Sequence, residues 1–285
     1  MDDAPIVPVT APWQLKGTVY SVTFFSQAGK LPDHAYSPLE RDSPYSSAAA
    51  SGEHRGGISQ FQVIRYTESP VGPYDELIVC PGSFNYEVEE GGRRKRKVKK
   101  DLRISRIYVS QKYTCWNGRT NWNIPKHLAR FEWDDLGGGG TGVRVYPHDT
   151  TGDSSELRPN TVPLFQATFK PMRWTPSFPF SVSWLRYVGL GACLVQPPLP
   201  EGQGSQGELP GTERWCKIVP GQATKRASLA WADLSQRDER GEPVTSVAHE
   251  NFWPGLGRWQ IALKLDDAVI DFDDGIHWDA PRTKL

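Results

Sequence analysis

Lys126 is the residue whose type and neighbours point most directly to chemistry. It lies in the segment IPKHLA (residues 124–129), between apolar Ile124 and Leu128. Pro125 is suited to the first position of a helix, because its φ is already near the helical value. We therefore predict one helical turn over 124–129, with Lys126 at its positive end. A lysine in such a place is pushed towards its neutral amine, which is a nucleophile for carbonyl carbon.

The amine can act in this way only if its surroundings lower its pKa. A free lysine has a pKa of about 10.4, so roughly one amine in 2,000 is neutral at pH 7. A helix terminus contributes about 0.3–1 kcal/mol, and up to ~2 kcal/mol when partly buried. Burial alone can lower a lysine pKa by about 3–5 pH units. Desolvation must therefore dominate, and a lysine exposed on a surface turn is the alternative.

The composition indicates a β-rich chain without a charge bias. The 285 residues include 33 Lys+Arg and 33 Asp+Glu, so we expect neither nucleic acid nor a membrane as a partner. Glycine (27) and proline (24) favour many turns, and the 32 aromatic residues (11 Trp, 11 Phe, 10 Tyr) can fill a core. We see no signal peptide and no apolar run of ~18 residues, and expect a soluble cytoplasmic protein.

The cysteines do not have the spacing of a metal site. Cys80, Cys115, Cys193 and Cys216 are far apart, with no Cys-x-x-Cys and no paired histidines nearby. We therefore expect free thiols, no bound metal and no cofactor.

Alternating and β-branched segments predict roughly ten to twelve strands, mostly antiparallel, and two or three short helices. A tight hairpin is expected at 265–268, and a short helix over 178–187. The segments 27–55 and 197–212 are predicted to be long loops, either lids or mobile surface. The predicted strands are 18–25, 57–66, 75–80, 102–110, 142–146, 164–170, 215–219, 229–233, 259–265 and 268–272.

Two low-complexity segments resemble functional motifs. The basic run 93–100 (RRKRKVKK) could be a nuclear-import or nucleic-acid patch. It follows Glu87, Glu89, Glu90 and a Gly-Gly pair, however, which favours a solvated hairpin with opposite charges facing each other. The segment 137–142 (GGGGTG) has no Gly-Lys-Ser/Thr after it, so we interpret it as a flexible connection rather than a phosphate loop.

Three segments together resemble the acetoacetate decarboxylase-like superfamily. They are SPVGPYDEL (69–77), RIYVS (106–110) and GRTNWNIPKHLA (118–129). Their order is similar to the family's Gly-Pro-Tyr-x-Glu strand start and its Gly-Phe-Pro-Lys-Lys-Leu-Ala-like turn. The likeness spans about residues 13–170. The remainder, including 208–217 and 251–259, resembles fungal proteins that carry this domain.

The resemblance implies a mainly β fold, a closed antiparallel β-barrel with a few short flanking helices, often in a homo-oligomer. We expect an arm over residues 1–12 and one domain over 13–285. The implied Schiff-base lysine, inside the apolar barrel, is matched by Lys126, and the family's pocket glutamate by Glu76. Acetoacetate decarboxylase is the established example of a lysine activated by apolar surroundings or a neighbouring cation. Its second lysine is replaced here by His127, and its pocket arginine has no counterpart around 23–30.

The leading hypothesis is a lyase-type enzyme that acts on a carbonyl substrate, a β-keto acid or a secondary-metabolite intermediate. Lys126 would form the Schiff base, and Glu76 would move protons. The alternative for Glu76 is a charge on an edge strand or an ion pair with Arg65 or Arg106. The alternative for the tryptophans is a place in the core. The candidates for binding the small apolar or carbonyl substrate are His127, Trp122, Tyr74, Arg119 and Trp116.

Two other functions are compatible with the same barrel. A non-covalent cyclase or pericyclase would fold a polyene into one reactive shape, with Lys126 or Glu76 only hydrogen-bonding a carbonyl. A carrier for an apolar ligand would need no chemistry. A fold shared with a family does not by itself fix the reaction.

Overall fold

A computed structural model describes most of the chain: residues 4–29, 31–90, 95–153, 155–189, 191–237, 240, 242, 252–253 and 256–280. Strands make up 48% of the structure and helices 12%, which confirms the mainly β class. The four cysteines are free. No helix in the described ranges has both the length and the apolar character needed to cross a membrane.

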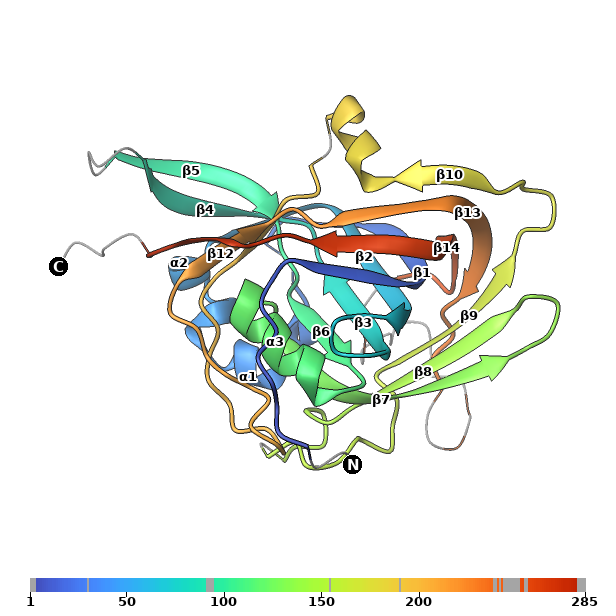
Figure 1. Cartoon of the computed structure of the whole chain (residues 1–285), viewed down its shortest axis with the longest axis horizontal. Coiled ribbons are helices and arrows are strands. Elements are labelled where there is room, and N and C mark those ends of the chain that lie inside the picture. The colour runs from blue at the N-terminus through green and yellow to red at the C-terminus, as the bar shows by residue number, and fades with distance from the viewer. Residues whose placement is uncertain are drawn as a thin grey trace.

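A closed barrel of nine strands forms the body of the described structure (Figure 1). The ring closes because β2 pairs with β1. Every neighbouring pair is antiparallel except β6 and β7, which are parallel. The expected closed barrel with few helices is therefore confirmed, with this one parallel pair. Around the ring the strands are β1 (Trp13–Ser26), β14 (Trp259–Phe272), β13 (Gly221–Asp233), β9 (Phe165–Pro171), β8 (Thr141–Pro147), β7 (Lys126–Asp135), β6 (Arg106–Val109), β3 (Tyr74–Cys80) and β2 (Glu53–Glu68).

Aromatic side chains fill the inside of the barrel. The ring centroids of Phe61 and Phe165, on opposite sides of the barrel, are 5.3 Å apart, and Tyr20 stacks on Phe169 at 4.4 Å. Because successive strand residues point to opposite faces, the neighbours of these residues point outward. The outer face is covered where helix α3 (Lys112–Trp122) crosses from β6 to β7. A parallel pair needs such a crossover connection.

A second set of strands extends the sheet beyond β2. The β4–β5 hairpin projects from the barrel (Figure 1), and Glu87 pairs with Arg96 at 3.1 Å. Both strands of the predicted charged hairpin are thus confirmed; its turn, residues 91–94, lies outside the described residues. The extension consists of β4 (Ser83–Glu90), β5 (Lys95–Leu102), β11 (Leu194–Gln196), β12 (Trp215–Ile218) and β15 (Ile276–Trp278).

The segment predicted as one long loop over 27–55 contains four short helices and the start of β2, so that prediction was wrong. It contains η1 (Asp33–Ala35), α1 (Pro38–Arg41), η2 (Pro44–Ser46) and α2 (Ala48–Ser51), and β2 begins at Glu53. Pro38 and Pro44 each start a helix, the position at which the missing proline N–H costs nothing.

The segment 124–129 was predicted to be a helical turn, and this was also wrong. Helix α3 ends at Trp122, where Asn123 takes the left-handed conformation (φ 54°) and caps it. Lys126 then begins strand β7, paired in register with Ile107 of β6. Lys126 is therefore the first residue of a strand and not part of a helix.

Two smaller predictions also differ from the structure. The expected hairpin at 265–268 is instead a bulge within the single strand β14, where Asp267 has a φ of 48°. The expected helix over 178–187 begins as strand β10 (Phe178–Ser181), which pairs with β13 outside the ring, and continues as the 3-10 helix η3 (Val182–Val188).

Candidate functional site

Lys126 and Glu76 form a buried ion pair. Lys126 is the first residue of β7, and Glu76 lies on β3, with β6 between the two strands. The Lys126 Nζ and Glu76 Oε2 atoms are 2.8 Å apart, and the residues are only 4% and 2% exposed. An amine and a carboxylate are thus held in direct contact and away from water.

Three further side chains complete the surroundings of this pair. The Lys126 amine also donates to Thr114 Oγ1 at 2.9 Å, and its Nζ lies 5.2 Å from the ring centre of Tyr74. The Tyr66 hydroxyl donates to Glu76 Oε1 at 3.0 Å. Burial, together with the nearby Glu76 carboxylate, raises the pKa of both Tyr66 and Tyr74 well above the usual range. Tyr66 therefore stays a hydrogen-bond donor to the carboxylate.

Helix α3 packs closely on the side chain of Lys126. A Cβ atom on Gly118 would come within 2.7 Å of Lys126 Cδ and Cε, so only glycine leaves room for the lysine stem. Thr114 and Gly118, four residues apart on the helix, form the surface over the amine. The Cys115 thiol donates to the Lys126 carbonyl at 3.2 Å.

The amine does not point into the barrel. Leu77, next to Glu76, and Ala129 of β7 pack in the interior cluster, whereas Leu128 packs with the cluster beneath α3. Strand alternation therefore places Lys126 and Glu76 on the outer face of the wall, under the helix. The position inside the barrel implied by the resemblance is not what the structure shows.

His127 lies on the opposite face, within a network of charges. Its Nε2 is 2.7 Å from Glu40 and its Nδ1 is 3.0 Å from Glu156, and Arg119 Nη1 lies 3.0 Å from Glu40. Burial opposes charge on the imidazole, but the two carboxylates outweigh it and raise the pKa of His127 to about 10. Burial alone would raise the pKa of Glu40, yet His127 and Arg119 lower it. His127 is therefore an imidazolium held by two carboxylates.

Arg119 links this network to the lysine backbone. It donates to the Lys126 carbonyl at 3.2 Å and to the carbonyls of Pro200 and Pro210 at 2.7 and 3.1 Å. Arg119, which was predicted to bind substrate, therefore holds the 197–212 segment against the start of β7.

The two candidate tryptophans take different places. Trp122 is buried between Trp13 and Phe272, with ring centroids 5.3 and 5.2 Å away, and its Nε1 donates to the Asp273 carbonyl. Trp116 is half-buried on α3. Of the predicted binding residues, Tyr74 is the one the structure places against the Lys126 amine.

The N-terminal arm crosses the outside of α3 (Figure 1). The Val9 N–H donates to Asn117 Oδ1 at 2.7 Å, and the amides of Asn117 and Asn121 donate to the carbonyls of Val7 and Val9. The arm thereby holds the helix that covers Lys126.

Four residues that contact Lys126, Glu76 or His127 were not among the candidates from the sequence: Glu40, Thr114, Tyr66 and Glu156. Thr114 is 12 residues from Lys126, and Glu40 is 87 residues from His127. Tyr66 alone had a local signal, because the β2–β3 turn pairs it with Tyr74 and so brings both rings near Glu76. In the described part of the chain, no cluster of three His, Cys, Asp or Glu side chains could hold a metal ion.

Comparisons with known proteins identify the fold. Neither the known protein families nor the curated proteins give a match to this sequence. An acetoacetate decarboxylase from Legionella pneumophila superposes with a TM-score of 0.54 at 12% identity, covering 95% of this chain and 88% of that one. A second solved acetoacetate decarboxylase gives 0.55 at 11%, covering 95% and 91%.

The fold is that of acetoacetate decarboxylase. At such low identity the likeness establishes the architecture and not the reaction. The likeness to fungal proteins stays a prediction.

Proposed function

We propose that the chain is a lyase-type enzyme that forms a Schiff base between Lys126 and the carbonyl group of a β-keto acid or a related substrate. The observation that supports this most is the buried primary amine 2.8 Å from a carboxylate, in an acetoacetate decarboxylase fold. Lysine amines that condense with carbonyls need a dry site and a nearby group to take the proton.

The first step is proton transfer along the Lys126–Glu76 hydrogen bond. The ammonium gives its proton to Glu76 Oε2, which turns the ion pair into two neutral groups. The free electron pair on Nζ then attacks the substrate carbonyl carbon. A proton of the attacking nitrogen moves to the carbonyl oxygen, which becomes the hydroxyl of a carbinolamine. Glu76 then returns its proton to this hydroxyl, water leaves, and the nitrogen electron pair forms the iminium ion.

The iminium accepts the electrons of the bond that breaks. In a β-keto acid, the bond between the carboxylate carbon and the α-carbon breaks, carbon dioxide leaves, and the electron pair moves into the iminium to give an enamine. Protonation of the α-carbon restores the iminium, and water then releases the ketone and the free amine. Tyr66 holds the second oxygen of Glu76 throughout and so orients the carboxylate.

Access to the amine requires movement. Lys126 is 4% exposed and covered by α3, which the N-terminal arm holds in place. The β2–β3 turn is also tied to this helix, because Gln111 Nε2 donates to the Val71 carbonyl at 3.0 Å. A substrate therefore reaches the amine only when these covering segments shift.

The test is decarboxylation of a panel of β-keto acids by matched lysine variants. Lys126→Met keeps an unbranched side chain of similar length but lacks the amine, and should lower kcat by at least about a thousandfold, or ~4 kcal/mol of barrier. Lys112→Met removes another buried lysine, at the start of helix α3, and should leave kcat within about threefold, which is under ~1 kcal/mol. Full turnover by Lys126→Met would exclude the proposal.

The hydrogen bonds from the Lys126 amine to Glu76 and Thr114 favour a second candidate, a non-covalent cyclase or binding protein. In that case Lys126 only donates a hydrogen bond to a carbonyl, and Lys126→Met lowers activity by about 10²–10³-fold, as for one electrostatic donor. A carrier would release its ligand unchanged. Neither would form a covalent adduct.

A further inference from the structure

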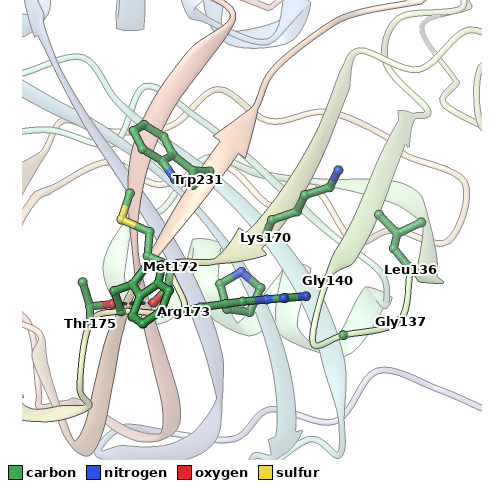
Figure 2. Close-up of a pocket in the computed structure, with 11 residues that line it drawn as sticks. Leu136, Gly137, Gly140, Lys170, Met172, Arg173, Thr175 and Trp231 are labelled. Carbon is green, nitrogen blue, oxygen red and sulfur yellow. Dashed lines mark hydrogen bonds between the residues drawn. The ribbon is translucent and has the colours of Figure 1, made fainter.

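A separate hollow lies at the far end of β7 from Lys126. It has a volume of about 640 Å³ and is formed by the β7–β8 connection, the segment after β9, and Trp231 of β13 (Figure 2). Lys126 and Asp135 are the two ends of β7, and ten strand residues span roughly 30 Å. The hollow is therefore distinct from the lysine site.

Large apolar side chains line this hollow and face solvent. Trp231 is 48% exposed and Trp174 is 97% exposed, and Met172 and Leu136 lie beside the same space. Large apolar side chains that are exposed together around a hollow often mark a binding site. A planar apolar group would cover the tryptophan faces.

Two cations lie at the edge of the same space with no carboxylate partner among the described residues. Lys170 and Arg173 both line the hollow, and Figure 2 shows Arg173 extending towards the β7–β8 connection. No ion pair joins either one to an acidic side chain in the ranges that the structure describes. Arg144 and Arg258, in a neighbouring hollow, are by contrast paired with Asp134 and Asp233. Lys170 and Arg173 are thus available to an anion.

Backbone hydrogen bonds hold both walls in shape. The Met172 N–H donates to the Leu229 carbonyl at 2.9 Å, and the Thr175 N–H to the Met172 carbonyl at 3.1 Å. In the opposite wall, the Gly140 N–H donates to the Gly137 carbonyl at 2.9 Å. The glycine-rich segment predicted as a flexible connection is therefore a hydrogen-bonded turn.

The glycines let this turn approach the other wall. Gly137, Gly138 and Gly139 have φ of 69°, 59° and 80°, a conformation that other residues rarely adopt. A Cβ on Gly139 would lie 3.2 Å from Pro171 Cγ, which shows how closely the two connections approach. The hollow is largely preformed, as small-molecule sites usually are.

We propose that this hollow binds a small amphipathic anion, with a carboxylate or phosphate headgroup on a planar apolar body. Lys170 and Arg173 hold the headgroup, and Trp231 and Trp174 cover the body. The volume is within the range of about 300–1,000 Å³ typical of ligand pockets. The proposal does not depend on the reaction proposed for Lys126.

Calorimetric titration of the full chain with three matched probes tests the proposal. 2-Naphthoate and 2-naphthyl phosphate carry the two headgroups, and 2-naphthamide has the same ring system without charge. We expect at least one anion to bind about tenfold more tightly than the amide, a difference that two cations can supply. The tighter of the two anions identifies the headgroup. Equal affinity for all three probes would overturn the proposal.

Variants then locate the site. Lys170→Gln and Arg173→Gln should each weaken the anion by about three- to tenfold and leave the amide unchanged, whereas Trp231→Ala should weaken all three probes. Lys225→Gln, an exposed lysine elsewhere on β13, and Lys126→Met should have no effect. Binding that survives both charge variants would contradict the proposal. So would a dimer that Trp174→Ala converts to a monomer, because the surface would then be an interface between copies.

Discussion

Lys126 and His127 are consecutive residues of β7, yet they lie on opposite faces of the barrel wall in very different surroundings. Beneath α3, Lys126 meets one carboxylate, Glu76, and the hydroxyl of Thr114. On the other face, His127 is held between Glu40 and Glu156, and Glu40 is shared with Arg119. One residue has a single acidic partner and the other has two.

This difference in surroundings gives Lys126 and His127 different proposed roles. Beneath the helix, the proposed chemistry needs one proton transfer along one hydrogen bond, from Lys126 to Glu76. At His127, both ring nitrogens donate to carboxylates, and removing its proton would leave Glu156 without its cation and Glu40 with Arg119 alone. We therefore assign the proposed chemistry to Lys126 and a supporting role to His127, which joins α1 to the loop that carries Glu156.

The largest effect on stability is expected from breaking the His127 network. His127→Leu leaves Glu156 buried without its imidazolium and should lower the free energy of unfolding by about 3–5 kcal/mol. Urea denaturation measures this. His54→Leu is the matched control, because this buried histidine donates only to the Pro81 carbonyl, and its loss should cost about 1 kcal/mol. Equal losses would show that the network adds nothing.

The same network should make stability depend on pH. The folded pKa of His127, about 10, is raised above the ordinary value of 6.5, so its contribution is complete below pH 6.5 and is lost as pH rises towards 10. The pKa of Glu40 is lowered from 4.5, so its contribution is present above that pH and is lost in acid. The unfolding free energy of the parent chain should fall between pH 6.5 and 10 relative to that of His127→Leu. A constant difference would contradict this.

On the lysine face, Gly118→Ala should harm activity more than stability. The added Cβ would displace the Lys126 stem, and a displacement of about 1 Å can cost about 10²-fold in rate. Alanine also favours the helix by about 1 kcal/mol, which offsets part of the clash. Activity and urea denaturation are both measured, with Gly191→Ala, which meets open space, as the control. An unchanged rate would mean that the position of the amine does not matter.

The smallest effect is expected from Tyr66→Phe, which removes one hydrogen bond to Glu76. We predict a loss of about 1 kcal/mol, or roughly fivefold in kcat. Tyr146→Phe removes a similar bond, to Glu132 on β7, and should leave kcat unchanged. If both variants behave alike, Tyr66 does not orient the catalytic carboxylate.

The sequence predicted the strands and the barrel better than the site. Alternation placed strands near 57–66 and 75–80, and opposite charges predicted the hairpin of β4 and β5; the structure confirms both. The helical turn predicted at 124–129 is wrong, because Pro125 does not start a helix. Asn123 ends α3, and pairing with β6 makes the residues from Lys126 onwards a strand.

The contacts of the candidate residues depend on pairing over long sequence separations. Glu76 and Lys126 meet because β6 aligns both on one face, and no local pattern shows which face α3 covers. Glu40 belongs to a short helix in a segment interpreted as a loop, so its contact with His127 had no signal in the sequence. The structure brings Lys126, Glu76 and Tyr74 together, and their chemical roles remain predictions.

The most direct measurement is borohydride trapping with acetoacetate, followed by mass spectrometry of the digested chain. Reduction of the Schiff base should leave one stable adduct, on the peptide that contains Lys126, and none on the peptide that contains Lys112. Decarboxylation that proceeds with no adduct at Lys126, or with the adduct at another lysine, would contradict the account.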